Sequence, residues 1–182
     1  MDNVRYGIIG LGNQGSTYIK YFFNEGKIKD CVITAVCDIN LKRLDAAKEY
    51  IKDKDVKYFE NYKDMLDSGL VDAVLVEVPH YLHPQMAIDC LERNINVLVE
   101  KPAGVYEKQV EEMNEASKKS GALFGMMFNQ RTNPLYRKMR ELVSNGAIGE
   151  FQRVTWIITD WYRPRAYYEA GGWRATWDGE GG

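Results

Sequence analysis

Residues 6–15 read YGIIGLGNQG, an apolar run that leads directly into a loop with three glycines. The spacing of Gly10, Gly12 and Gly15 matches the pattern GxGxxG, which is informative when it joins a strand to a helix. Gly10 would permit a tight turn, and Gly12 would let the main chain approach a pyrophosphate. Gly15 would let the helix pack closely on the strand. The loop therefore predicts a dinucleotide site.

Asn13 and Gln14 lie where the next helix is expected to begin. Unpaired N–H groups and the helix dipole at such an end attract phosphate oxygens. Asp38 ends the next apolar run, where a carboxylate can bind ribose hydroxyls and would repel a 2′-phosphate. We therefore expect NAD as the cofactor. The alternatives are that Asp38 caps the following helix, and that Arg43 meets a phosphate, which would allow NADP.

Short apolar runs alternate with segments of helical period over roughly the first 145 residues. Strands are expected at 6–9, 32–37, 56–59, 73–76, 97–99 and 123–127. Helices are expected at 14–25, 41–52, 62–68, 83–93, 106–120 and 133–145. This α/β order predicts a Rossmann fold, a doubly wound parallel sheet with helices on both faces.

The composition changes near residue 150, after which all four tryptophans lie. Residues 151–161 are rich in β-branched and aromatic side chains, which is typical of a strand. One strand cannot form a stable sheet. We therefore expect a Rossmann domain at 1–148, followed at 149–182 by the first strand and loop of an incomplete α/β substrate domain.

Two polar segments follow strands at one edge of the expected sheet. Residues 77–84 contain Pro79, His80 and His83, and residues 100–102 read Glu-Lys-Pro. Ligands of open α/β sheets bind beyond the carboxyl ends of the strands, so Pro79, both histidines and the Glu-Lys pair are expected to contact the cofactor. No cysteine or carboxylate stands at ligand spacing with both histidines, so no metal site is expected.

Lys101 is the candidate catalytic residue. Hydride transfer at an alcohol carbon requires a proton to join or leave the oxygen. Burial and a nearby nicotinamide cation would lower the pKa of a lysine, which suits that task. The alternative is a surface lysine paired with Glu100. Asn129 and Arg131 follow a later strand and are the predicted substrate-binding residues.

Composition and charge narrow the partners. A net charge of −2 without a basic run gives no reason to expect nucleic acid. No apolar run approaches the ~20 residues that span a bilayer, and the N-terminus lacks the core of a signal peptide. The cysteines Cys31, Cys37 and Cys90 have no CxxC spacing and read as small apolar residues in a reducing compartment. We expect a cytoplasmic protein.

Together these segments resemble the glucose–fructose oxidoreductase, inositol dehydrogenase and rhizopine-catabolism family, written Gfo/Idh/MocA. The matching pieces are residues 7–15, Asp38, residues 79–83, residues 100–102 and residues 129–131. The resemblance implies an NAD(P)-dependent oxidoreductase of sugars, cyclitols or related polyols, with Lys101 as its active-site lysine. It also implies a homo-oligomer. The pair His80-Tyr81 departs from the family, which usually has an asparagine at this place.

The family continues past a glycine-rich segment into a motif with an aspartate and a histidine, and this chain stops at Gly181-Gly182. We therefore expect a truncated chain that binds cofactor and turns over little. Its missing strands should leave apolar surface exposed near Trp156 and Trp161 and favour self-association. The alternative functions are a non-catalytic dinucleotide-binding regulator or redox sensor, and a reductase of another substrate.

Overall fold

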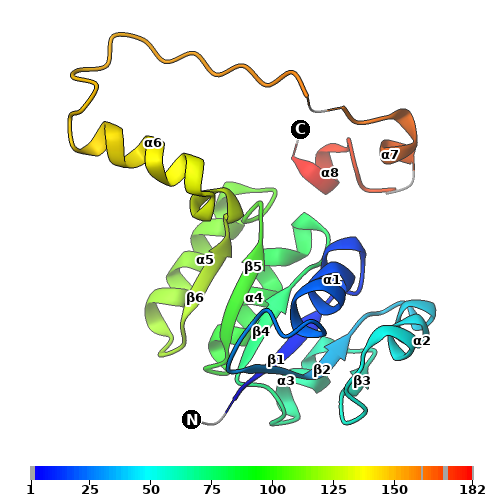
Figure 1. The fold of residues 1–182 in the computed structure, drawn as a ribbon. Coiled ribbons are helices and arrows are strands. Elements are labelled where there is room, and N and C mark those ends of the chain that lie inside the picture. Colours follow the sequence, from blue (N-terminus) through cyan, green and yellow to red (C-terminus); the bar gives the residue numbers. More distant parts are fainter. Residues whose placement is uncertain (1–2, 161, 170–171, 182) are drawn as a thin grey trace. The chain divides into compact units, whose positions relative to one another are not determined.

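The computed structural model describes residues 3–160, 162–169 and 172–181. The chain forms two compact units, one from residues 1–127 with 176–182 and the other from residues 128–175. The first unit contains a parallel sheet of six strands (Figure 1) in the order β3-β2-β1-β4-β5-β6. The strands are β1 (Val4–Ile9), β2 (Cys31–Cys37), β3 (Lys57–Phe59), β4 (Ala73–Val76), β5 (Asn96–Glu100) and β6 (Phe124–Met127). The predicted Rossmann sheet is confirmed.

The helices of the first unit lie where the apolar periodicity predicts them. They are α1 (Asn13–Tyr18), α2 (Leu41–Tyr50), α3 (Tyr62–Asp67), α4 (His83–Glu92) and α5 (Glu107–Lys119). Residues Ile19–Phe23 continue α1 as a π-helix, η1, and residues His80–Leu82 form a 3-10 turn, η2. A short C-terminal helix, α8 (Trp177–Glu180), was not predicted, although Thr176 caps it by accepting from the N–H of Gly179 at 3.0 Å.

Two apolar layers cover the sheet, which explains why its strands are apolar without alternation. Ile9 packs in the layer made with α3, α4 and α5, whereas Ile8 packs in the layer made with η1 and α2. Successive strand residues face opposite sides, so a strand covered on both faces needs apolar residues at every position. The strand order reverses between β1 and β4, and ligands of open α/β sheets bind beyond the carboxyl ends of the strands at such a point.

The second unit contains the 3-10 turn η3 (Asn129–Thr132) and the helices α6 (Pro134–Ser144) and α7 (Arg165–Glu169). The predicted strand at 151–161 is wrong over residues 151–160, which pair with no strand, and residue 161 lies outside the described residues. An extended segment needs a neighbouring strand for its N–H and C=O groups. As predicted, apolar surface is exposed here, because Trp156 is 58% exposed.

The division after Met127 differs from the predicted boundary at residue 148. Helix α6 belongs with the segment that follows it, since the rings of Tyr136 and Trp156 lie 5.6 Å apart. Leu135, on the same helix, is exposed. The assignment of residues 149–182 to the start of a substrate domain stays a prediction.

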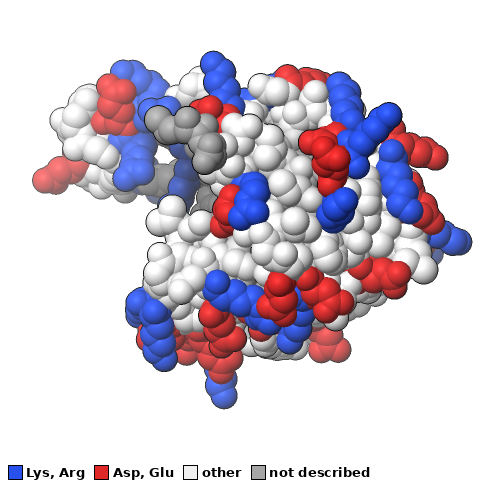
Figure 2. All heavy atoms as spheres, turned by 90° about the horizontal axis from the view of Figure 1, so that it is seen from below, with Lys and Arg blue, Asp and Glu red and all other residues white. Residues whose placement is uncertain are grey.

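Charged side chains of both signs are interspersed on the face shown in Figure 2. Oppositely charged neighbours also form ion pairs, such as Arg5 with Asp72 at 2.6 Å and Arg93 with Asp67 at 2.6 Å. In the described part of the chain, no helix is both long enough and apolar enough to cross a bilayer.

Candidate cofactor site

Gly10 makes the turn that leaves β1. Its φ is +96°, in the region that glycine adopts at no steric cost. Its N–H donates to the carbonyl of Cys37 at 2.8 Å, which continues the ladder with β2. A Cβ on Gly10 would lie 2.4 Å from the carbonyl oxygen of Glu77, so only glycine fits between β2 and β4.

Gly15 and Gly12 have opposite surroundings. Gly15 is buried in the first turns of α1, and a Cβ there would lie 2.0 Å from the carbonyl oxygen of Gly10. Gly12 is the N-cap of α1 without a side-chain cap, and a Cβ there would meet no atom within 4 Å. Asn13 and Gln14 lie exposed beside this open space. The bare main chain at the helix start thus fits a pyrophosphate, which needs N–H donors and room.

Asp38 holds the glycine loop to the end of β2. The side chain is 5% exposed. One oxygen accepts from the N–H of Leu11 at 2.8 Å and the other from the N–H of Asn40 at 2.8 Å. The Arg43 guanidinium lies 3.4 Å from the same carboxylate. The helix-cap alternative is wrong, because Asn40 caps α2 by accepting from the N–H of Lys42 at 3.0 Å.

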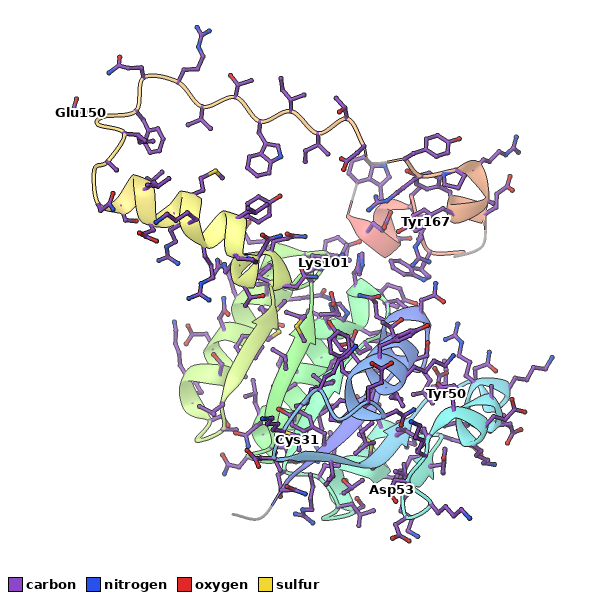
Figure 3. All side chains as sticks on the ribbon, viewed as in Figure 1. Cys31, Tyr50, Asp53, Lys101, Glu150 and Tyr167 are labelled. Atoms are coloured by element: carbon purple, nitrogen blue, oxygen red, sulfur yellow. The ribbon has the colours of Figure 1, made fainter. Side chains whose placement is uncertain are left out.

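Lys101 lies at the carboxyl edge of the sheet (Figure 3), at the opposite end from Cys31 on β2. The Lys101 side chain is exposed and not buried as predicted. Its main-chain N–H donates to Glu100 Oε2 at 2.9 Å, and its peptide bond to Pro102 is cis. No carboxylate of the described residues forms an ion pair with the Lys101 ammonium group, so the paired-lysine alternative is not what the structure shows.

The buried side chain of His83 connects the loop that follows β4 to the loop that follows β5. His83 begins α4 and has 0% of its surface exposed. Its ring nitrogens lie 2.7 Å from the carbonyl oxygen of Pro102 and 2.8 Å from that of Val78. Burial lowers the pKa of His83, although both carbonyls oppose that shift. A side chain without exposed surface cannot contact a ligand in this conformation. The predicted contact of His83 with the cofactor is therefore wrong for this conformation, and His83 instead holds the two loops together.

The other predicted loop residues remain accessible. Pro79 is half-buried and precedes η2, and His80 is half-buried with its ring centroid 5.7 Å from that of His83. Both therefore present surface at the edge where a ligand would lie. Asn129 and Arg131 are exposed in η3, and the Arg131 guanidinium lies 5.1 Å from the ring of Phe128. These two belong to the second unit, so their contact with substrate stays a prediction.

Glu77 and Tyr18 are not among the site residues predicted from the sequence. Glu77 and Glu100 are 8% and 6% exposed, and the Tyr18 hydroxyl donates to Glu100 Oε1 at 3.3 Å. Burial, followed by the charge of Glu100, raises the pKa of Glu77 to about 8. Burial is also the largest cause that raises the pKa of Tyr18. A glutamate directly after a fully apolar strand was the available signal for Glu77.

The cysteine thiols give no sign of a chemical role in this site. All three are free, and Cys37 and Cys90 are buried. Burial is the largest cause that raises the pKa of both thiols to about 12, which keeps them protonated and unreactive. Among the described residues, no group of three or more His, Cys, Asp or Glu side chains could hold a metal ion.

Comparison with known proteins agrees with this geometry. Over residues 4–128 the chain matches the model of the Gfo/Idh/MocA proteins, described as an oxidoreductase family with an NAD-binding Rossmann fold. The chain belongs to this family. The resemblance inferred from the glycine loop and the Glu-Lys-Pro segment is therefore confirmed, and NAD is the cofactor of the fold.

Several relatives are inositol dehydrogenases. The chain is 31% identical over 147 residues to myo-inositol 2-dehydrogenase of Thermotoga maritima, covering 81% of this chain and 42% of that protein. Scyllo-inositol dehydrogenase of Lactobacillus casei, with bound NAD(H) and scyllo-inositol, has a TM-score of 0.72 at 27% identity, covering 82% of this chain and 43% of that one.

A third similarity extends over both units of the chain. The WlbA dehydrogenase of Bordetella pertussis, in complex with NADH and UDP-GlcNAcA, has a TM-score of 0.84 at 25% identity. The match covers 98% of this chain and 53% of that one. The chain thus spans about half the length of the relatives that it matches.

Proposed function

We propose that this chain carries the cofactor site of an NAD-dependent dehydrogenase that acts on a sugar, a cyclitol or a related polyol. The observation that supports it is the open space at Gly12, which lies between a strand and an uncapped helix start. Relatives named for inositol, and a structural neighbour in complex with UDP-GlcNAcA, support this substrate class. When bound, NAD would accept or donate a hydride.

Each side chain of the site has a proposed task. The main chain of the glycine loop binds the pyrophosphate, and Asp38 with Arg43 binds the adenosine ribose. Pro79, His80 and Glu100 line the nicotinamide side of the edge. Lys101 moves a proton to or from the substrate oxygen, for which its exposed ammonium group is free to turn toward a ligand. In the second unit, Asn129 and Arg131 bind substrate hydroxyls.

Asp38→Ala is expected to weaken the binding of NAD(H) by about tenfold or more, because a hydrogen bond to a charged group contributes ~1.5–3 kcal/mol. The variant also releases the N–H of Leu11, which would weaken NAD(H) and NADP(H) alike. Loss of the ribose contact can be distinguished from this effect, because it also lowers the ratio of the affinity for NAD(H) to the affinity for NADP(H). Calorimetric titration with both cofactors measures that preference.

Asp45→Ala is the matched control, because Asp45 is an exposed carboxylate on α2, the helix that follows Asp38, and is paired only with Lys48 among the described ion pairs. It should leave both affinities unchanged. An unchanged NAD(H)-to-NADP(H) preference in Asp38→Ala would show that Asp38 braces the loop and does not bind ribose.

We also propose where the protein resides and how it assembles. Three free cysteines fit a reducing compartment, and we place the protein in the cytoplasm. Exposed Leu135 and Trp156 in the second unit are an apolar surface that association would cover, which supports a homo-oligomer. A dinucleotide-binding regulator without catalysis is the alternative function, and loss of turnover on substitution of Lys101 separates the two.

A further inference from the structure

Glu77 is a buried carboxyl group without a partner. It directly follows β4, it is 8% exposed, and neither side-chain oxygen has a hydrogen-bond donor among the residues that the structure describes. A buried carboxylate ion without donors is strongly unfavourable, so such a group holds a proton unless a cation lies next to it. The glycine loop, Asp38 and Lys101 carry out the proposed reaction without this group.

Glu77 lies beside a second buried carboxyl group. Val76 of β4 pairs with Val99 of β5, so the next residues of the two strands, Glu77 and Glu100, are also neighbours. Paired residues of parallel strands point to the same face, and the strands lie about 4.8 Å apart. Both glutamates are on the face that α1 covers, where Tyr18 reaches Glu100. We name Glu77 and Glu100 the carboxyl pair.

Among the described residues, no Lys or Arg side chain forms an ion pair with either member of the carboxyl pair. From α1, the Tyr18 hydroxyl donates a hydrogen bond to Glu100 and not to Glu77. From α4, burial lowers the pKa of His83, and its ring nitrogens lie against the main-chain carbonyls of Pro102 and Val78 and not against either carboxyl group. Asp38, beyond Gly10, accepts from main-chain N–H groups, and Lys101 forms no ion pair with the described carboxylates. Two neighbouring carboxyl groups that are not paired with a cation do not both ionise easily, because the two negative charges repel one another.

The position of the carboxyl pair points to the nicotinamide half of the cofactor. Gly10 lies between Asp38 on one side and Glu77 on the other, because β1 pairs with both β2 and β4. With the adenosine ribose at Asp38 and the pyrophosphate at the glycine loop, the other half of a dinucleotide falls on the side of β4 and β5. The nicotinamide ring is positively charged in NAD⁺ and neutral in NADH.

We propose that the carboxyl pair makes the preference for NAD⁺ over NADH depend on pH, by holding one proton that leaves when the positively charged ring binds. The inference rests on the proposed function, since it requires NAD at the glycine loop. The step breaks one O–H bond of Glu77 and releases the proton to solvent, and no oxidation is involved. The carboxylate that remains neutralises the ring.

The direction of the pH dependence follows from the two states of Glu77. Its pKa is about 8 before binding, and a bound cation lowers that pKa. The affinity for NAD⁺ should therefore be low below the lowered value, rise with pH up to about 8, and stay level above it. Each unit by which the ring lowers the pKa raises the affinity by about tenfold. NADH has no ring charge and should show no such rise.

Calorimetric titration at about pH 6 and about pH 9 tests this inference. The ligands are NAD⁺, NADH and ADP-ribose, which has the same adenosine and phosphates without the ring. In the unmodified protein, the affinity for NAD⁺ relative to NADH should rise by about tenfold or more between the two pH values. Titrations near pH 7.5 in buffers of different ionisation enthalpy should show that NAD⁺ releases a proton and ADP-ribose does not.

Glu77→Gln should abolish both the pH dependence and the proton release, because an amide has no proton to lose. Glu112→Gln, on the exposed face of α5, is the matched control and should retain both. Glu100→Gln removes the neighbouring charge, so the rise in NAD⁺ affinity should move to lower pH.

The unmodified protein alone can overturn the inference, so it does not depend on any variant folding. If NAD⁺ and NADH bind but their affinity ratio is the same at both pH values, the inference is wrong and the proposed function stands. It is also wrong if Glu77→Gln keeps the dependence. If none of the three ligands binds at either pH, the proposed function fails, and the inference fails with it.

Discussion

Lys101→Met will lower the turnover of the best polyol substrate by a factor of about 10²–10⁴, which is the usual contribution of a positioned proton donor or acceptor. The affinity for NADH should stay within about threefold of the unmodified value, because the glycine loop and Asp38 hold the cofactor without the lysine. Steady-state rates measure the first effect and calorimetric titration the second. The assay uses protein expressed from the complete gene.

Lys108→Met is the control, since Lys108 is exposed in the first turn of α5 and outside the loop of Lys101. It should leave turnover unchanged. Lys101→Arg retains the positive charge but holds its proton at all accessible pH values, so it should also lose turnover if proton transfer is the task. Full turnover in Lys101→Met would remove the catalytic assignment and favour the regulator.

Gly15→Ala will lower the free energy of unfolding by about 3 kcal/mol, at the upper end of the usual cost of overpacking. The new Cβ would lie 2.0 Å from the carbonyl oxygen of Gly10, which is main chain and cannot turn aside. Helix α1 must therefore move away from β1. The melting temperature should fall by about 6–12 °C for a chain of this size, as thermal unfolding followed by circular dichroism would measure.

The matched control is Gly121→Ala. A Cβ there lies 3.4 Å from Asn94 Oδ1, an ordinary contact with a side chain. Its melting temperature should change by no more than about 3 °C. If Gly15→Ala proves as stable as this control, the close approach of helix and strand is not a requirement of the fold.

The sequence was sufficient to predict the sheet and helices α1 to α5 of the first unit, but not the short helix α8. Each apolar run became a strand because the sheet is covered on both faces, and residues such as Ile8 and Ile9 both find a core. The three glycines lie where they were predicted. Gly10 adopts a positive φ, Gly15 allows close packing of helix on strand, and Gly12 leaves open space at the helix start. The same local rules failed at residues 151–160, because strand propensity does not supply a neighbouring strand.

The site was predicted less completely. Local spacing located Lys101 and Asp38 at the edge of the sheet, but it could not show that Asp38 binds the N–H of Leu11. The same limit hid the burial of His83 and the pairing of Glu77 with Glu100, since both depend on strand order. Contacts between residues far apart in the sequence need the fold before they can be assigned.

The central claim is that a pyrophosphate occupies the open space at Gly12, and titration of Gly12→Val with NADH tests it most directly. A Cβ at Gly12 meets no protein atom within 4 Å, so the variant should fold with a melting temperature close to that of the unmodified protein. NADH should bind about a hundredfold more weakly, because the added methyl groups occupy the space of the phosphates and the main-chain N–H bonds to them are lost. A folded Gly12→Val protein that binds NADH as tightly as the unmodified one would contradict the account.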